Sequence, residues 1–236
     1  MQENFSRVFI TGDTHANIDW HKLNSANFKQ GKELTKNDFV IICGDFGGVW
    51  DGDVIDKYIQ NWYNKQPWTT LFIDGNHENF DLLKQYPVED WNGGKVHKIS
   101  DSIYHLMRGQ IYEINGKKFF TFGGAESRDQ AFRTPYVSWW PQELPSYQEC
   151  TNALNNLDSV GYRVDYVISH CAPSQFEKII YGEEYKQNAA TKFLDTVYNL
   201  VEYKDWYCGH HHLDANLNSY QIHFMFNRVI ELNTQV

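Results

Sequence analysis

Five short motifs place Asp, His or Asn side chains directly after an apolar run of the length of a buried strand. In chain order, they are Thr11–His15, Cys43–Gly48, Asp74–Glu78, Ser169–Pro173 and Cys208–His212. In a parallel α/β arrangement the carboxyl ends of the strands share one edge, which is where ligands usually bind. The sequence therefore predicts that five strand ends deliver polar side chains to one neighbourhood.

These side chains offer only nitrogen and oxygen ligands, which suit Mn, Fe or Zn in an open, water-accessible site. The candidate ligands are Asp13, His15, Asp45, Asn76, His170, His210 and His212. Seven ligands are too many for one ion that keeps a water, so we expect two divalent metal ions. Two neighbouring cations need a shared anion, and Asp45, on a middle strand, is the candidate for that bridge.

The series Gly-Asp-x-His, Gly-Asp, Gly-Asn-His-Glu, a lone His and Gly-His-x-His resembles the calcineurin-like metallophosphoesterase superfamily. The stretches 75–83 and 138–146 also resemble a subgroup of small bacterial and phage-type members. Each motif alone is weak, whereas all five in this order cover most of the chain. The resemblance implies an α/β fold, a four-layer α/β/β/α sandwich of two mixed sheets flanked by helices.

The resemblance also implies a role for each candidate ligand. Two sets would each bind one ion: Asp13, His15 and His212 the first, and Asn76, His170 and His210 the second. Asp45 would bridge the ions, and His77 would face the scissile phosphate without binding metal. Asp45 and His77 are therefore the expected catalytic residues.

This arrangement predicts metal-dependent hydrolysis of a phosphate ester. Metal coordination lowers the pKa of water from ~15.7 towards ~7, so a hydroxide bridging the ions is available at neutral pH. The hydroxide would attack phosphorus in line while His77 assists departure of the alcohol. Arg128 and Arg133, in a loop after a buried strand, are candidate contacts for the substrate phosphate.

One position departs from the family pattern. Many members, including the protein Ser/Thr phosphatases, carry Gly-Asp-x-x-Asp at the second motif, often followed by Arg. In those members the Arg binds phosphate, and the later Asp orients the catalytic His. Gly48 stands at that position and no Arg follows, so Asp51 and Asp74 become candidates for orienting His77. The missing Arg and an aromatic loop favour diesters over monoesters. The alternatives are a phosphatase-like monoesterase and a non-catalytic binding scaffold on the same fold.

The elements that must position these residues alternate between strands and helices, which predicts βαβ units in one domain over residues 1–236. Strands are expected at Arg7–Thr11, Phe39–Cys43, Thr70–Ile73, Ile103–Met107, Ile111–Ile114, Lys118–Phe122, Tyr166–Ser169, Trp206–Cys208, Gln221–Phe226 and Val229–Leu232. Helical pattern covers Asn17–Phe28, Asp53–Asn64, Phe80–Gln85, Ser146–Leu157 and Ala189–Val201. The turn signals Arg108-Gly109 and Asn115-Gly116 predict hairpins.

Composition is that of a soluble globular protein, with 42% hydrophobic and 22% charged residues among 236. A formal charge of −9 argues against strong general nucleic-acid binding. It does not exclude a small-molecule or nucleotide phosphate ester, because bound cations reverse the local polarity. The sequence shows no signal peptide, no apolar run long enough to span a membrane and no Cys-x-x-Cys pair, which favours a cytoplasmic protein with reduced thiols.

Overall fold

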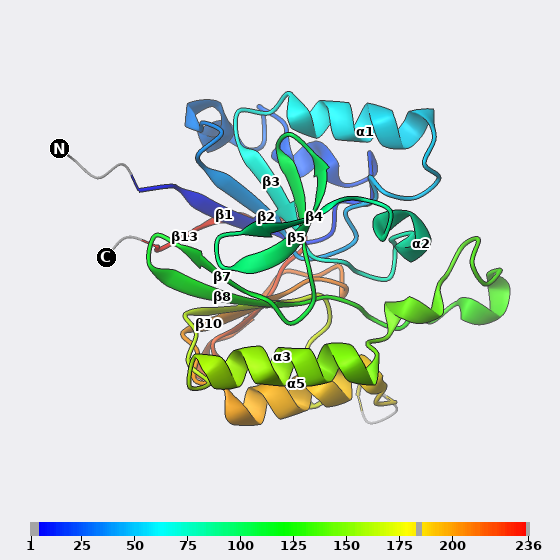
Figure 1. Cartoon of the computed structure of the whole chain (residues 1–236), viewed down its shortest axis with the longest axis vertical. Coiled ribbons are helices and arrows are strands. Elements are labelled where there is room, and N and C mark those ends of the chain that lie inside the picture. Colours follow the sequence, from blue (N-terminus) through cyan, green and yellow to red (C-terminus); the bar gives the residue numbers. More distant parts are fainter. Residues whose placement is uncertain (1–4, 183–185, 235–236) are drawn as a thin grey trace.

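A computed structural model of the chain describes residues 5–182 and 186–234. Its strands form two mixed sheets (Figure 1). In spatial order, the first sheet contains β13 (Val229–Leu232), β1 (Val8–Thr11), β2 (Phe39–Ile42), β3 (Thr69–Phe72), β6 (Ile103–Leu106), β5 (Gly94–Ser100) and β4 (Val88–Trp91). The second contains β11 (Ala215–Leu217), β12 (Ile222–Phe224), β10 (Asp205–Cys208), β9 (Tyr166–Ser169), β8 (Lys117–Phe122) and β7 (Ile111–Ile114).

Helices cover the outer face of each sheet, which confirms the predicted four-layer sandwich (Figure 1). They are α1 (Val54–Asn64), α2 (Phe80–Leu83), α3 (Tyr147–Ser159), α4 (Ser174–Tyr181) and α5 (Ala189–Leu200). Ile59 of α1 packs on the first sheet, and Leu157 of α3 and Leu194 of α5 pack on the second. Within the described part of the chain, no helix is long and apolar enough to cross a membrane.

Alternating side chains divide the apolar residues of each strand between two cores. On β1, Val8 and Ile10 pack between the sheets, whereas Phe9 packs towards the outer layer of the first sheet. On β9, Ile168 lies between the sheets and Val167 faces the helices of the second sheet. Successive side chains of a strand point to opposite faces, so strands that are apolar throughout belong in sheets covered on both sides.

The registers of the central strands bring the predicted strand ends to the same edge. In the first sheet β1, β2 and β3 are parallel, and Thr11, Ile42 and Phe72 lie in line. In the second sheet β9 and β10 are parallel, and Ser169 pairs with Cys208. The loops that leave these five strands carry all the predicted metal ligands.

The helix predicted over Asn17–Phe28 is wrong, because that segment contains only a 3₁₀ turn at Trp20–Leu23. The side chain of Asn24 accepts hydrogen bonds from the backbone N–H groups of Ala26 and Asn27, each at 2.9 Å. An Asn side chain that binds local N–H groups in this way competes with helical hydrogen bonding, so the amphipathic pattern does not become a helix.

The hairpin predicted at Arg108-Gly109 is also wrong, since β6 belongs to the first sheet and β7 to the second. The turn instead carries the chain across the sandwich. Asn115-Gly116 does join β7 to β8, with positive φ angles of 53° and 71° that suit a type I′ turn. Strands β4, β5 and β11 and helix α4 were not predicted; β4 is mostly exposed and two of its four side chains are charged, which hides it from an apolar pattern.

Candidate metal centre

The seven predicted ligands approach one another from both sheets. Oxygen donors come from the loops after β1, β2 and β3, and imidazoles come from the loops after β1, β9 and β10. The oxygen donors are Asp13, Asp45 and Asn76, and the imidazoles are those of His15, His170, His210 and His212. The oxygen donors and His170 are at most 5% exposed, although they are charged or polar. Buried groups of this kind require a partner.

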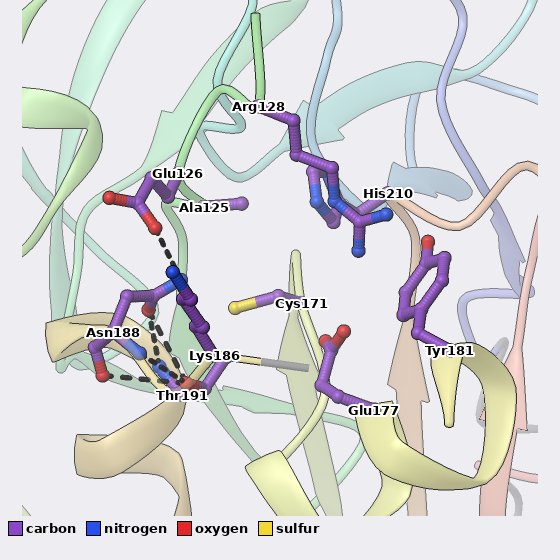
Figure 2. A pocket seen from close by; sticks show the side chains of 10 residues that line it. All are labelled: Ala125, Glu126, Arg128, Cys171, Glu177, Tyr181, Lys186, Asn188, Thr191 and His210. Atoms are coloured by element: carbon purple, nitrogen blue, oxygen red, sulfur yellow. Dashed lines mark hydrogen bonds between the residues drawn. The ribbon is translucent and has the colours of Figure 1, made fainter. Parts of the chain in front are cut away.

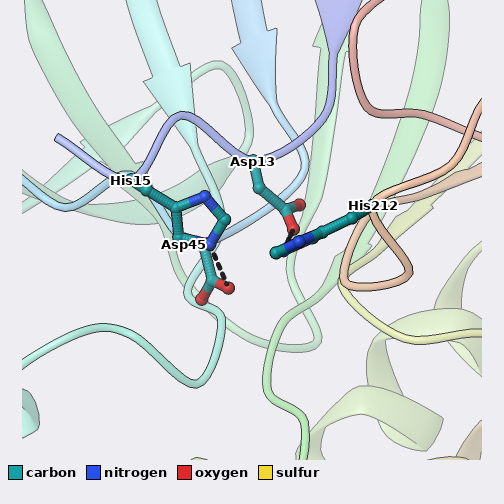
Figure 3. A group of neighbouring side chains, drawn as sticks. All are labelled: Asp13, His15, Asp45 and His212. Atoms are coloured by element: carbon teal, nitrogen blue, oxygen red, sulfur yellow. Dashed lines mark ion pairs between the residues drawn. The ribbon is translucent and has the colours of Figure 1, made fainter. Parts of the chain in front are cut away.

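A first group consists of Asp13, His15, Asp45 and His212, whose ligand atoms all lie within 4.8 Å of one another (Figure 3). His15 Nε2 is 3.3 Å from Asp45 Oδ2, and His212 Nε2 is 3.2 Å from Asp13 Oδ2. The side chain of His212 is 52% exposed. The group is therefore open to water on one side, as a catalytic metal site must be.

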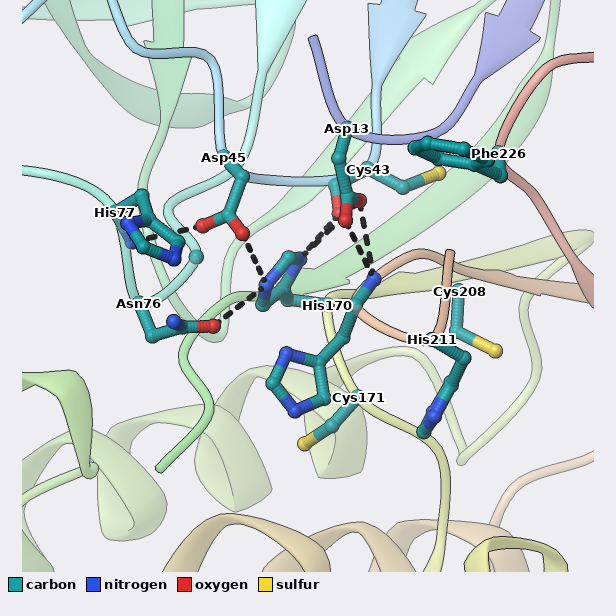
Figure 4. A network of polar contacts seen from close by, with 12 residues as sticks. Asp13, Cys43, Asp45, Asn76, His77, His170, Cys171, Cys208, His211 and Phe226 are labelled. Carbon is teal, nitrogen blue, oxygen red and sulfur yellow. Dashed lines mark hydrogen bonds and ion pairs between the residues drawn. The ribbon is translucent and has the colours of Figure 1, made fainter. Parts of the chain in front are cut away.

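A second group forms around His170 (Figure 4). Its Nε2 lies 3.4 Å from Asp45 Oδ2 and 3.2 Å from Asn76 Oδ1. The ring of His210 is 5.1 Å from the ring of His170, centroid to centroid. Asp45 thus contacts both groups through the same oxygen, so the two groups of predicted ligands are adjacent.

The donor atoms of these groups fit divalent cations. His170 Nδ1 lies 2.6 Å from the carbonyl oxygen of Cys43, which can only accept, so Nδ1 carries the proton. His15 Nδ1 lies 2.8 Å from Asp19 Oδ2. Metal-binding histidines have this pattern, with one nitrogen fixed by a carbonyl or carboxylate and the other turned to the metal. Each Nε2 faces oxygen acceptors, and a divalent cation between them would take the place of the proton on Nε2.

The electrostatics of the site also favour positive charge. Burial opposes charge on His170, but the carboxylate of Asp45 outweighs it and raises the pKa of His170 to about 10. On His15 burial is likewise outweighed, chiefly by the hydrogen bond to Asp45, and its pKa rises to about 9. Burial opposes charge on Asp45 too, yet His170 and His15 hold the pKa of Asp45 well below its usual range.

Four of the ten described non-glycine residues with a positive φ angle are predicted ligands. His15, Asp45, His210 and His212 have φ angles of 41°, 52°, 66° and 50°. Residues other than Gly avoid this left-handed region, at a cost of roughly 1–2 kcal/mol each. Strain of this kind persists where the surrounding structure enforces it, often at functional sites.

Two glycines of the motifs leave room for ligand side chains. A Cβ atom at Gly44 would overlap the imidazole of His170, and one at Gly209 would overlap the carboxylate of Asp13. The chain turns directly after Gly209, so that the His210 N–H donates to Asp13 Oδ1 at 3.0 Å. Both glycines are required because the next strand end approaches too closely for any side chain.

His77 lies beside the first group, with its ring 5.4 Å from that of His15. Its N–H donates to Asp45 Oδ1 at 2.8 Å, and burial lowers the pKa of its imidazole. Asp74, a candidate for orienting His77, is used elsewhere: its carboxylate accepts from Arg108 Nε at 2.8 Å and lies 3.1 Å from His105 Nε2. The suggestion for Asp74 is therefore wrong.

The ring next to His77 on the other side belongs to Trp50, at 6.2 Å between centroids. Trp50 lies two residues beyond Gly48, where the family pattern has its second Asp. Asp51, the other candidate for orienting His77, is exposed. The aromatic ring of Trp50 thus lies beside His77, where the sequence analysis expected a carboxylate to orient that histidine.

Sequence reasoning gave no role to Glu78, which is fully buried. Its carboxylate accepts the N–H of Phe46 at 2.6 Å and the N–H of Gly75 at 2.5 Å. Glu78 therefore ties together the two loops that carry Asp45 and Asn76. Its place at the end of Gly-Asn-His-Glu was the available signal.

The two candidate phosphate contacts differ in their surroundings. Arg133 Nε is paired with Asp129 at 2.8 Å, and Nη1 donates to the carbonyl of Ser138 at 3.1 Å. Arg128 lies over the ring of Tyr181 and lines a pocket together with His210 (Figure 2). Arg128 is therefore the one placed next to a predicted ligand.

Comparison with known proteins identifies relatives of the chain. Lariat debranching enzyme A of Xenopus laevis is 28% identical over 132 residues, which is 50% of this chain and 23% of that protein. The lariat debranching enzyme of Danio rerio is 26% identical, over 71% of this chain and 31% of the relative. That of Entamoeba histolytica is 26% identical, over 94% and 68% respectively. The chain thus spans less than a third of the first two relatives.

The sequence also matches the calcineurin-like phosphoesterase family over residues 6–222. This range contains all five motifs and all seven candidate ligands. It confirms the superfamily, the fold and the class of metal-dependent phosphoesterases that the five motifs predicted. The chain belongs to the calcineurin-like phosphoesterase family.

Proposed function

We propose that the chain hydrolyses phosphodiesters with two divalent ions of Mn, Fe or Zn. The observation that carries this proposal is the position of Asp45 Oδ2, 3.3 Å from His15 Nε2 and 3.4 Å from His170 Nε2. One carboxylate oxygen between two imidazoles suits a ligand shared by two cations. Asp13 and His212 would complete the first site, and Asn76 and His210 the second.

The ions, His77 and Asp45 each have a defined task in this proposal. Bound ions would supply an acidified water and neutralise phosphoryl oxygens, as such centres do in phosphoryl transfer. His77, beside the first group, would protonate the departing alcohol oxygen, a contribution of typically about 10²–10⁴-fold. The backbone N–H of His77 holds Asp45 Oδ1 at 2.8 Å, which leaves Oδ2 facing the imidazoles.

Three features favour a diester over a monoester. The second motif lacks the phosphate-binding Arg of the protein phosphatases, with Gly48 and Val49 following Gly47. Aromatic side chains, including Trp50, line the neighbourhood of His77. The relatives are named for the debranching of lariats, which adds a branched nucleic-acid diester to the small and nucleotide esters as a substrate class.

Parallel assays test the proposal. The purified chain, loaded with Mn²⁺, is incubated with p-nitrophenyl phosphate and with bis(p-nitrophenyl) phosphate, and its metal content is measured. We expect bound metal and faster hydrolysis of the diester. A rate confined to the monoester would instead support the phosphatase-like alternative. Absence of both metal and hydrolysis would support the binding scaffold. Branched and linear RNA oligonucleotides of equal length then test the substrate class.

A further inference from the structure

A pocket of about 360 Å³ opens beside the second group of predicted ligands (Figure 2). Arg128, Tyr181, Glu177 and His210 line one side of it, and Lys186, Asn188 and Glu126 line the other. Ligand pockets measure about 300–1,000 Å³, so this one suits a small group. Because His210 is a predicted metal ligand, a group in the pocket would adjoin the metal centre.

Arg128 differs from the other five arginines of the chain. Each of those five has a carboxylate oxygen at 2.5–3.3 Å, whereas Arg128 has no such partner among residues 5–182 and 186–234. Its guanidinium carbon instead lies 3.7 Å from the centroid of the Tyr181 ring. A cation–π contact fixes the position of a guanidinium without neutralising its charge. Among the described residues, Arg128 therefore brings to the pocket a cation without a carboxylate at ion-pair distance, although Glu126 and Glu177 also line the pocket.

Tyr181, whose ring lies under Arg128, is in turn contacted by His211 through its hydroxyl group. The hydroxyl of Tyr181 is 2.9 Å from Nδ1 of His211. His211 Nε2 is 3.0 Å from Glu177 Oε1, which is an ion-pair contact without the angle of a hydrogen bond. The same carboxylate oxygen accepts the N–H of Ala172 at 2.9 Å, in the loop after β9. His211 is 8% exposed and Glu177 is 1% exposed. This chain of contacts, the Tyr181–His211–Glu177 relay, links the pocket wall to the backbone.

We infer that this pocket is an anion subsite in which Arg128 contacts the phosphoryl group of the substrate and the relay positions Arg128. The inference rests on the proposed function, since the phosphoryl group must also reach the metals beside His210. A guanidinium binds phosphoryl oxygens through two parallel N–H donors, which demands a fixed orientation. His211 is thus a positioning residue, although it stands between two predicted ligands.

A double-mutant cycle with inorganic phosphate as the probe tests the inference. Phosphate binding to the Mn²⁺-loaded chain is measured by calorimetry, alongside metal content and KM. We expect Arg128→Ala to raise the phosphate Kd at least about tenfold, the effect of losing hydrogen bonds to a charged group. Tyr181→Phe, which removes only the hydroxyl, should raise it about three- to tenfold. The double variant should bind no more weakly than Arg128→Ala alone.

Tyr203→Phe is the matched control, because its hydroxyl also makes a hydrogen bond, to the carbonyl of Tyr220 at 2.9 Å. It should leave the phosphate Kd unchanged. An unchanged phosphate Kd in Arg128→Ala would overturn the subsite. If the increases in Kd of the two single variants multiply in the double variant, the relay is overturned. Loss of metal from Tyr181→Phe would also overturn the relay, since the tyrosine would then act through the ligands. Phosphate binding that follows the expected pattern without ester hydrolysis would refute only the proposed function.

Discussion

Asp45 Oδ2 lies 3.4 Å from Nε2 of His170, a contact that joins a loop of the first sheet to a loop of the second. The same oxygen is 3.3 Å from Nε2 of His15. Both imidazoles are fixed at their other nitrogen, by the Cys43 carbonyl and by Asp19. The two groups of predicted ligands therefore depend on one carboxylate, and its removal should affect both.

Replacing Asp45 tests this dependence. Asp45→Asn keeps the size of the side chain but removes the charge that both imidazoles face. We expect metal affinity to fall more than about 100-fold, beyond the effect of losing an outer hydrogen-bond partner, with almost no diester hydrolysis left. Metal analysis after dialysis gives the readout. Asp158→Asn, on the exposed face of α3, is the control; retention of both ions by Asp45→Asn would refute the bridge.

Replacing His77 should separate chemistry from metal binding. In His77→Ala the turnover number should drop about 10²–10⁴-fold, the usual contribution of a general acid, while both ions stay bound. Steady-state rates on the aryl diester and metal content are measured on the same sample. His21→Ala removes an exposed imidazole and serves as control. If His77→Ala loses its metals, His77 is a ligand and its assigned role is wrong.

A methyl group at Gly209 should disrupt the site by sterics alone. Gly209→Ala would place its Cβ against the carboxylate of Asp13 and the carbonyl of Cys43, so the chain should lose metal affinity. Gly161→Ala meets open space at a φ of 64° and should cost only about 1–2 kcal/mol of backbone strain. Urea unfolding and metal analysis distinguish the two. Equal metal content in both variants would contradict the close approach.

The buried ion pair of Asp74 and Arg108 should be important for stability. Arg108 Nη2 lies 2.5 Å from Asp74 Oδ2, and both side chains are at most 4% exposed. Asp74→Asn leaves the buried guanidinium, as its remaining carboxylate contact in the described part of the chain, the longer one of Nη1 with Glu149, at 3.5 Å, and should cost about 3–5 kcal/mol in unfolding free energy. Glu202→Gln breaks the exposed pair with Arg163 and should cost at most about 1 kcal/mol. Similar losses in the two variants would show that Arg108 is solvated.

His97 should make stability depend on pH. Burial, followed by repulsion from His105, lowers the pKa of His97 to about 4 in the folded chain, against about 6.5 when unfolded. The unfolded state therefore binds more protons between these values, so stability is lost as pH falls from about 7 to 4.

We expect His97 to account for about 1 kcal/mol of the loss between pH 7.5 and pH 5, after allowance for solvent screening. Urea unfolding at both pH values measures the loss in the wild-type chain and in His97→Gln. The variant should lose that much less. Parallel losses in the two proteins would mean that His97 titrates normally.

The sequence was sufficient to predict the layers and the place of each candidate ligand, because strand ends and glycines are local signals. Asp13, for instance, follows an apolar strand and a glycine, and its position needs no long-range information. The prediction of a helix over Asn17–Phe28 was wrong for a local reason as well, since the side chain of Asn24 binds N–H groups that a helix would use.

What surrounds the ligands was not predictable, because it depends on pairs far apart in sequence. Asp74 meets Arg108 and His105 only after β3 and β6 have paired. His211 resembled a spacer between two ligands until the structure placed Tyr181 and Glu177 on its two nitrogens. A motif specifies which residue stands at a strand end, but not which partners the rest of the fold brings to it.

The division of the predicted ligands between the two sheets has a consequence for synthesis. A ribosome releases Asp13, Asp45 and Asn76 with β1, β2 and β3, long before the imidazoles of His170 and His210 emerge. Until then the growing polypeptide carries only part of the proposed ligand set. The complete set of proposed ligands is thus assembled late, when the C-terminal half docks on the first three strands.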